Sequence, residues 1–136
     1  MKNVSAKKHL GQHFLNDETI AQKIGESLVN YDNYKNIQEV GPGMGVMTKY
    51  IREKYPKHDF RLIELDKESV AYLGVQFPLL KVYNDDFLKL DFKKVFKEEF
   101  AVIGNYPYNI SSQIVFKVID NRELVPEMSG MFQKEV

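Results

Sequence analysis

Short apolar runs alternate with stretches of helical period along this chain. The runs predict five strands, at residues 37–40, 60–65, 80–83, 100–104 and 130–133. Between them, apolar residues recur every three or four positions, which is typical of amphipathic helices. Strands that alternate with helices at this spacing indicate βαβ units. We therefore expect an α/β fold with a mostly parallel sheet and helices on both faces.

Polar residues mark where the predicted helices begin. Asp17 precedes the first apolar stripe, and Asp66 follows the second strand, so each is expected to cap a helix. Ser111 or Ser112 is the expected cap of the helix after the fourth strand. Residues 87–96 are apolar but fit neither period.

Composition excludes several classes of protein. The 136 residues suit one packed domain, since 43% are hydrophobic and only 28% are charged. The absence of cysteine excludes disulfides and thiolate chemistry. No apolar run approaches the roughly 20 residues of a membrane span, and no apolar stretch follows the N-terminal lysines. We therefore expect a cytoplasmic protein that binds no membrane. The 19 basic and 19 acidic residues balance, so net charge gives no signal for nucleic acid.

A glycine-rich loop, Glu39-Val40-Gly41-Pro42-Gly43-Met44-Gly45, follows the first predicted strand. Ligands of open α/β sheets bind beyond the carboxyl ends of the strands, and glycine lets backbone approach a ligand closely. A dinucleotide fingerprint needs a third glycine where this chain has Val46. The spacing therefore favours a ligand without a pyrophosphate. A structural strand-to-helix turn is the alternative.

Acidic residues follow the next two predicted strands. Glu64 lies where such sheets place the acceptor for a ribose diol, with Asp66 as the competing residue. Asp86 follows the third strand and is a candidate acceptor for an adenine amine, although Asp85 competes for this role. Each aspartate can also simply cap a turn. Together with the loop, Glu64 and Asp86 indicate an adenosine site.

The segment Asn105-Tyr106-Pro107-Tyr108 comes directly after the fourth predicted strand. The exocyclic amine of adenine is a poor nucleophile because its lone pair is delocalised into the ring. An Asn side-chain oxygen and a backbone carbonyl that accept its two hydrogens would favour the pyramidal, nucleophilic form. An aromatic ring would stack on the flipped base. This chemistry needs no metal. A rigid turn is the alternative.

These segments, with Lys8-His9-Leu10-Gly11-Gln12-His13-Phe14-Leu15-Asn16-Asp17 before them, resemble the ribosomal RNA adenine dimethyltransferase family, in its bacterial KsgA (RsmA) branch. The resemblance runs from about residue 7 to residue 136. It implies a class I S-adenosylmethionine-dependent (Rossmann-like) methyltransferase fold. It also implies dimethylation of the N6 amines of two adjacent adenosines near the 3′ end of small-subunit ribosomal RNA, with the immature 30S subunit as partner.

The resemblance also implies a role for each matching residue. The implied contacts with S-adenosyl-L-methionine come from His13, Leu15, Gly41, Gly43, Glu64, Asp86 and Asn105. The implied catalytic segment is Asn105, Tyr106, Pro107 and Tyr108, with the Tyr106 carbonyl as second acceptor and Tyr108 stacked on the base. Many members have Asn where this chain has His13, which we expect to be neutral beside a sulfonium. We expect a monomer.

Members of that family are about twice as long as this chain. We therefore expect residues 1–136 to be the N-terminal part of the catalytic domain, with residues 1–17 as a basic arm and cofactor motif. Lys2, Lys7, Lys8 and His9 of the arm are candidate phosphate contacts. The last strands, an antiparallel hairpin, and a C-terminal helical domain are expected to be absent.

Three other functions compete with this one. The related methyltransferase of large-subunit RNA, which confers macrolide resistance, shares the glycine loop and the Asn-x-Pro-Tyr segment. A fragment that binds cofactor or RNA without turnover is the non-enzymatic alternative. An NAD-dependent enzyme conflicts with Val46 and with the absence of a hydride-transfer acid or base.

Overall fold

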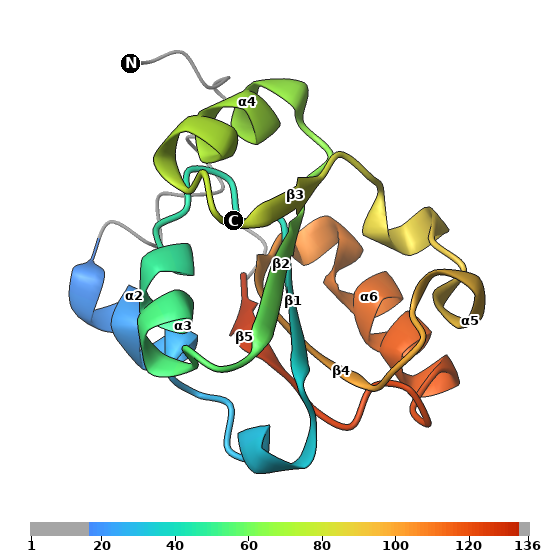
Figure 1. Ribbon diagram of the computed structural model, residues 1–136. Helices are drawn as coiled ribbons and strands as arrows, with labels where there is room; N and C mark the ends of the chain where they lie inside the picture. The colour runs from blue at the N-terminus through green and yellow to red at the C-terminus, as the bar shows by residue number, and fades with distance from the viewer. Residues whose placement is uncertain (1–16, 134–136) are drawn as a thin grey trace.

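The computed structural model describes residues 17–133, which form one five-stranded sheet (Figure 1). Its strands are β1 (Asn36–Val40), β2 (Asp59–Ile63), β3 (Lys81–Tyr83), β4 (Phe100–Tyr106) and β5 (Met128–Phe132). They run in the order β3-β2-β1-β4-β5, and every neighbouring pair is parallel. The predicted parallel sheet is confirmed, with β1 and β4 at its centre.

Helices cover both faces of the sheet, as predicted (Figure 1). One layer consists of α2 (Glu18–Gly25), α3 (Thr48–Lys54) and α4 (Lys67–Gln76), and the other of η3 (Phe87–Lys89), α5 (Phe92–Val95) and α6 (Tyr108–Asp120). A short turn, η2 (Tyr31–Asn33), precedes β1. Alternate residues of each central strand enter the two cores, so Ile103 packs in the first and Val102 in the second. Within residues 17–133, no helix is long and apolar enough to cross a membrane.

Two of the three predicted helix caps are present. The Asp17 carboxylate accepts from the N–H of Thr19 and caps α2, and Asp66 accepts from the N–H of Ser69 and caps α4, both at 2.9 Å. The serine cap of α6 is wrong. That helix begins at Tyr108 behind Pro107, whose φ of −61° and ψ of 143° direct the chain into the helix.

β4 extends further than the apolar run predicts. Asn105 and Tyr106 belong to the strand because they pair with Met131 and Phe132 of β5. β5 itself begins earlier than predicted, at Met128. The Asn-x-Pro-Tyr segment therefore starts inside the sheet, where its backbone pairs with β5, and leaves the sheet at its proline.

Candidate functional site

Strand register brings three predicted site residues to one edge of the sheet. Val40, the last residue of β1, is in register with Ile63 of β2 and with Gly104 of β4. The residues that follow these positions therefore form one row along the carboxyl edge: Glu64, Gly41 and Asn105. The N–H of Gly41 donates to the carbonyl of Ile63 at 2.9 Å, which joins two members of the row. Gly41 and Glu64 directly follow their strands, as predicted, whereas Asn105 lies inside β4 and not after it.

Glu64 holds the glycine loop. It is 1% exposed, and its carboxylate accepts from the N–H of Gly43 and from the N–H of Asp66, each at 2.9 Å. The loop needs glycine, because Gly41, Gly43 and Gly45 have φ values of 66°, 59° and 81°. No described atom lies within 4 Å of the position that a Cβ on Gly41 would take. Gly41 thus presents bare backbone to open space.

A second carboxyl group lies buried beneath the loop. Glu39 is 2% exposed and accepts from the hydroxyl of Thr48, at the start of α3, at 2.6 Å. Burial, with the nearby charge of Glu64, raises the pKa of Glu39 to about 8, although the Thr48 hydrogen bond acts in the opposite direction. Glu39 is the first residue of the predicted glycine-rich loop, but the sequence pattern predicts no role for it.

The two aspartates after β3 have different surroundings. Asp86 caps η3 by accepting from the N–H of Leu88 at 3.0 Å. Asp85 lines a cavity on the α5 face of the sheet. Their neighbour Asn84, which the sequence did not single out, donates to the carbonyls of Glu64 and Leu65 at 3.0 and 2.9 Å. Asn84 therefore joins the carboxyl ends of β2 and β3.

The four residues of the Asn-x-Pro-Tyr segment lie in different environments. The Asn105 side-chain oxygen accepts from Nε2 of Gln133 at 3.0 Å. Tyr106 is fully buried and its hydroxyl donates to the carbonyl of Ser129 at 2.7 Å, so only its backbone belongs to the edge. Pro107 starts α6, and the Tyr108 side chain is 50% exposed. Tyr108 is thus exposed three residues beyond Asn105 in the chain.

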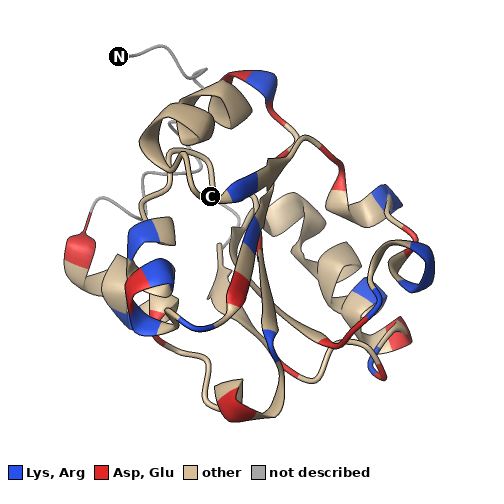
Figure 2. Ribbon diagram, viewed as in Figure 1, with Lys and Arg blue, Asp and Glu red and all other residues tan. Residues whose placement is uncertain are grey.

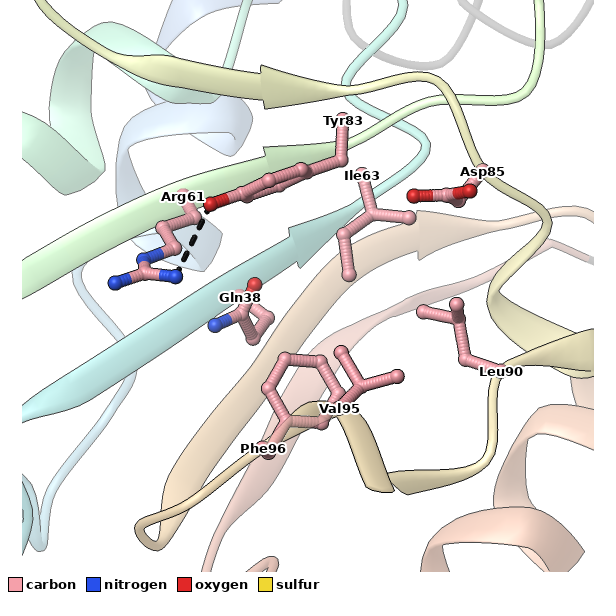
Figure 3. Close-up of a pocket in the computed structure, with 8 residues that line it drawn as sticks. All are labelled: Gln38, Arg61, Ile63, Tyr83, Asp85, Leu90, Val95 and Phe96. Atoms are coloured by element: carbon pink, nitrogen blue, oxygen red, sulfur yellow. Dashed lines mark hydrogen bonds between the residues drawn. The ribbon is translucent and has the colours of Figure 1, made fainter. Parts of the chain in front are cut away.

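Two hollows lie near this edge. The larger, about 470 Å³, is lined by the residues that follow Glu64: Leu65, Asp66, Lys67 and Glu68. Leu65 is 62% exposed there and offers an apolar surface that the sequence pattern does not predict. Figure 3 shows the smaller cavity, about 190 Å³, in which Arg61 donates to the Tyr83 hydroxyl at 3.1 Å. None of its lining residues belongs to the glycine loop or to residues 105–108.

Charges are spread over the molecule. Figure 2 shows basic and acidic residues interspersed around the sheet, with long uncharged stretches on α4 and α6. Residues 17–133 hold no group of three or more His, Asp or Glu side chains that would bind a metal ion. The predicted contacts of His13 and Leu15, and of the arm residues Lys2, Lys7, Lys8 and His9, lie outside the described residues.

Solved structures share this fold. The 23S rRNA methyltransferase ErmE has a TM-score of 0.65 at 24% identity, over 81% of this chain and 43% of that chain. SAM-bound CalS10, an amino pentose methyltransferase from Micromonospora echinaspora, has a TM-score of 0.54 at 15% identity, over 76% of this chain and 44% of that chain. At these identities the likeness confirms the class I methyltransferase fold.

Sequence comparison is more specific. The family model for ribosomal RNA adenine dimethylase matches residues 3–136. Ribosomal RNA small subunit methyltransferase A of Flavobacterium johnsoniae is 54% identical over 139 residues, which is 100% of this chain and 52% of the relative. The chain thus spans about half the length of the curated relatives it matches. Because the match covers nearly every residue, the chain belongs to the ribosomal RNA adenine dimethylase family.

Proposed function

We propose that this chain forms the cofactor- and base-binding part of an S-adenosylmethionine-dependent rRNA methyltransferase. Its reaction dimethylates the N6 amines of two adjacent adenosines near the 3′ end of small-subunit ribosomal RNA, as a step in ribosome biogenesis. In this proposal, residues 1–136 are the N-terminal part of the catalytic domain. One observation carries the proposal: register sets Glu64, Gly41 and Asn105 side by side at the carboxyl edge.

The residues around the glycine loop fit S-adenosylmethionine. The open space beside Gly41 admits a ligand against the backbone, and a carboxylate has about four acceptor sites. We assign the ribose hydroxyls to Glu64, whose carboxylate also accepts from the N–H groups of Gly43 and Asp66. The exposed Leu65 offers an apolar surface to one face of an adenine ring, and Asp86 is the acceptor for its amine. When bound, the cofactor supplies an electrophilic methyl group.

Asn105 and Tyr106 would make the target amine nucleophilic. The Asn105 side-chain oxygen and the Tyr106 carbonyl are successive acceptors at the end of β4, and each accepts one of the two amine hydrogens. This would localise the nitrogen lone pair for attack on a methyl carbon whose bond to sulfur breaks, and the methylated amine would then release one proton to water. The half-exposed Tyr108 ring would stack on the flipped base, a contact worth about 1–3 kcal/mol in other proteins. Pro107 keeps that ring at the start of α6.

The proposed contacts with RNA come from the N-terminal arm. Charges on the described residues are mixed, so Lys2, Lys7 and Lys8 of the N-terminal arm are the proposed phosphate contacts. We propose the immature 30S subunit as the partner and the cytoplasm as the compartment. The proposed enzyme acts as a monomer and uses no metal.

Activity is best tested in a fusion of this chain to the remaining half of the Flavobacterium johnsoniae relative. Small and large subunits from cells that lack both methyltransferases would be incubated with labelled S-adenosylmethionine. We expect label in the small subunit only. Label in the large subunit would instead support the macrolide-resistance activity. A folded fusion that binds cofactor without any transfer would support the non-catalytic alternative and overturn the proposal.

Matched variants separate chemistry from folding. Asn105→Ala should lower kcat about a hundredfold or more, by analogy with loss of one preorganised hydrogen-bonding group elsewhere. The same change at Asn109, which is exposed on α6, should leave kcat within about twofold. Glu64→Ala should weaken cofactor binding by about 1–3 kcal/mol in calorimetric titration. Unchanged turnover in Asn105→Ala would refute the role of its side chain in activating the amine.

A further inference from the structure

Gln133, directly after β5, contacts both groups assigned to the target amine. Its side-chain Nε2 donates to the side-chain oxygen of Asn105 at 3.0 Å. Its backbone N–H donates to the carbonyl of Tyr106 at 3.2 Å. One residue of the neighbouring strand therefore touches both acceptors of the proposed reaction.

The strand register accounts for this double contact. Asn105 pairs with Met131, and Gln133 follows Met131 by two positions, so the side chains of Asn105 and Gln133 leave the same face of the sheet. The Tyr106 side chain leaves the opposite face, where its ring packs against Phe132 with centroids 5.0 Å apart. The side chains of Asn105 and Tyr106 are thus each contacted by a residue at the end of β5, on opposite faces of the sheet.

The orientation of the Asn105 amide decides whether it can accept from an amine. One end of the amide is an acceptor and the other carries two donors, and a half-turn about the last side-chain bond exchanges them. The reversed orientation would direct N–H groups at the hydrogens of the target amine. A donor from Gln133 favours the productive orientation. Because a carbonyl oxygen has two lone pairs, it can accept from both Gln133 and the amine.

We propose that Gln133 is a positioning residue that sets the orientation of the Asn105 amide for methyl transfer. The inference rests on the proposed function, because the Asn105 amide has to be oriented toward the target amine. Gln133 itself is assigned no contact with cofactor or base. Its side chain bears on the reaction through its hydrogen bond to Asn105. Its loss should therefore lower kcat and leave the affinities for cofactor and subunit unchanged.

Two substitutions test the donor specifically, in the fusion protein described above. Gln133→Met keeps the length of the side chain but removes the donor, and kcat should fall about fivefold to tenfold, as expected for one hydrogen bond. Gln133→Glu replaces the donor by an acceptor and should cost more. Its kcat relative to the unsubstituted protein should recover as the pH is lowered, because a protonated carboxyl group can donate. The same two changes at Gln113, exposed on α6, are the controls.

A second measurement needs no activity. In this chain alone, the side-chain amide signals of Asn105 are identified by NMR from their loss in Asn105→Asp. Their order parameter should fall in Gln133→Met and stay unchanged in Gln113→Met. Turnover within twofold for Gln133→Met, or an unchanged order parameter, would overturn the inference. If the unsubstituted fusion transfers no methyl groups while the order parameter falls as expected, the proposed function fails and the positioning contact stands.

Discussion

Replacement of Glu39 by glutamine should stabilise the protein above neutral pH. Glu39 is buried on β1, and its carboxyl group accepts from the Thr48 hydroxyl at 2.6 Å. Glutamine has the same shape and keeps an oxygen to accept that bond. The substitution therefore removes a buried ionisable group with little change in packing.

The size and sign of the effect follow from the pKa of Glu39. Burial raises this pKa from 4.5 to about 8, so the folded protein keeps a proton that the unfolded chain has already released. Between these values the folded state binds more protons, and the free energy of unfolding falls as the pH rises. At 1.36 kcal/mol for each pKa unit, the loss across this window is at most about 5 kcal/mol. Glutamine does not titrate, so the Glu39→Gln variant does not undergo this loss of stability.

Urea unfolding at pH 5 and at pH 8.5 measures the effect. The gain from Glu39→Gln relative to the unsubstituted protein should be small at pH 5 and several kcal/mol at pH 8.5. Glu53→Gln, at an exposed position of α3, controls for the loss of one negative charge. If Glu39→Gln changes stability equally at both pH values, Glu39 is not protonated in the folded protein and the reasoning is refuted.

Three further substitutions and one control test packing and hydrogen bonding by thermal unfolding. Gly45→Ala should destabilise the protein by about 2–4 kcal/mol. Its Cβ would lie 2.5 Å from a ring carbon of Phe77, and the φ of 81° is unfavourable for alanine. The control Gly74→Ala, whose Cβ meets open space, should be neutral or stabilising. Gln38→Met should stabilise the protein by about 1 kcal/mol, because the buried side-chain oxygen of Gln38 has no hydrogen-bond partner among the described residues. A loss of stability would indicate that water in the cavity binds this oxygen. Glu127→Gln should cost about 1–3 kcal/mol, because its carboxylate accepts from two backbone N–H groups and a tyrosine hydroxyl.

The architecture could be predicted because its signal is local. Central parallel strands are buried on both faces, so they appear as continuous apolar runs such as residues 100–104. Strand ends depend instead on the neighbouring strand. The polar residue Asn105 extends β4 because it pairs with Met131, a contact that no local pattern reveals. Ser111 failed as a cap for the same kind of reason, since Pro107 had already started the helix.

The position of the candidate site was predictable, but its internal contacts were not. The rule that ligands bind at carboxyl ends, applied to a parallel sheet, is enough to bring Gly41, Glu64 and Asn105 to one edge. The bonds from Gly43 to Glu64 and from Gln133 to Asn105 span 21 and 28 residues. They depend on loop conformation and strand register, which hydrophobic periodicity does not encode.

These long-range contacts share a feature that bears on how the site works. Glu64 and Asn84 both bind protein backbone at the carboxyl edge, and Gln133 binds the backbone carbonyl of Tyr106. Each contact fixes main chain that would otherwise have to be ordered when a ligand arrives. Affinity is then not reduced by the entropy of ordering the loop. Glu64, the buried side chain among these, therefore has two roles, and its substitution weakens binding through the loop as well as through any lost contact with the ligand.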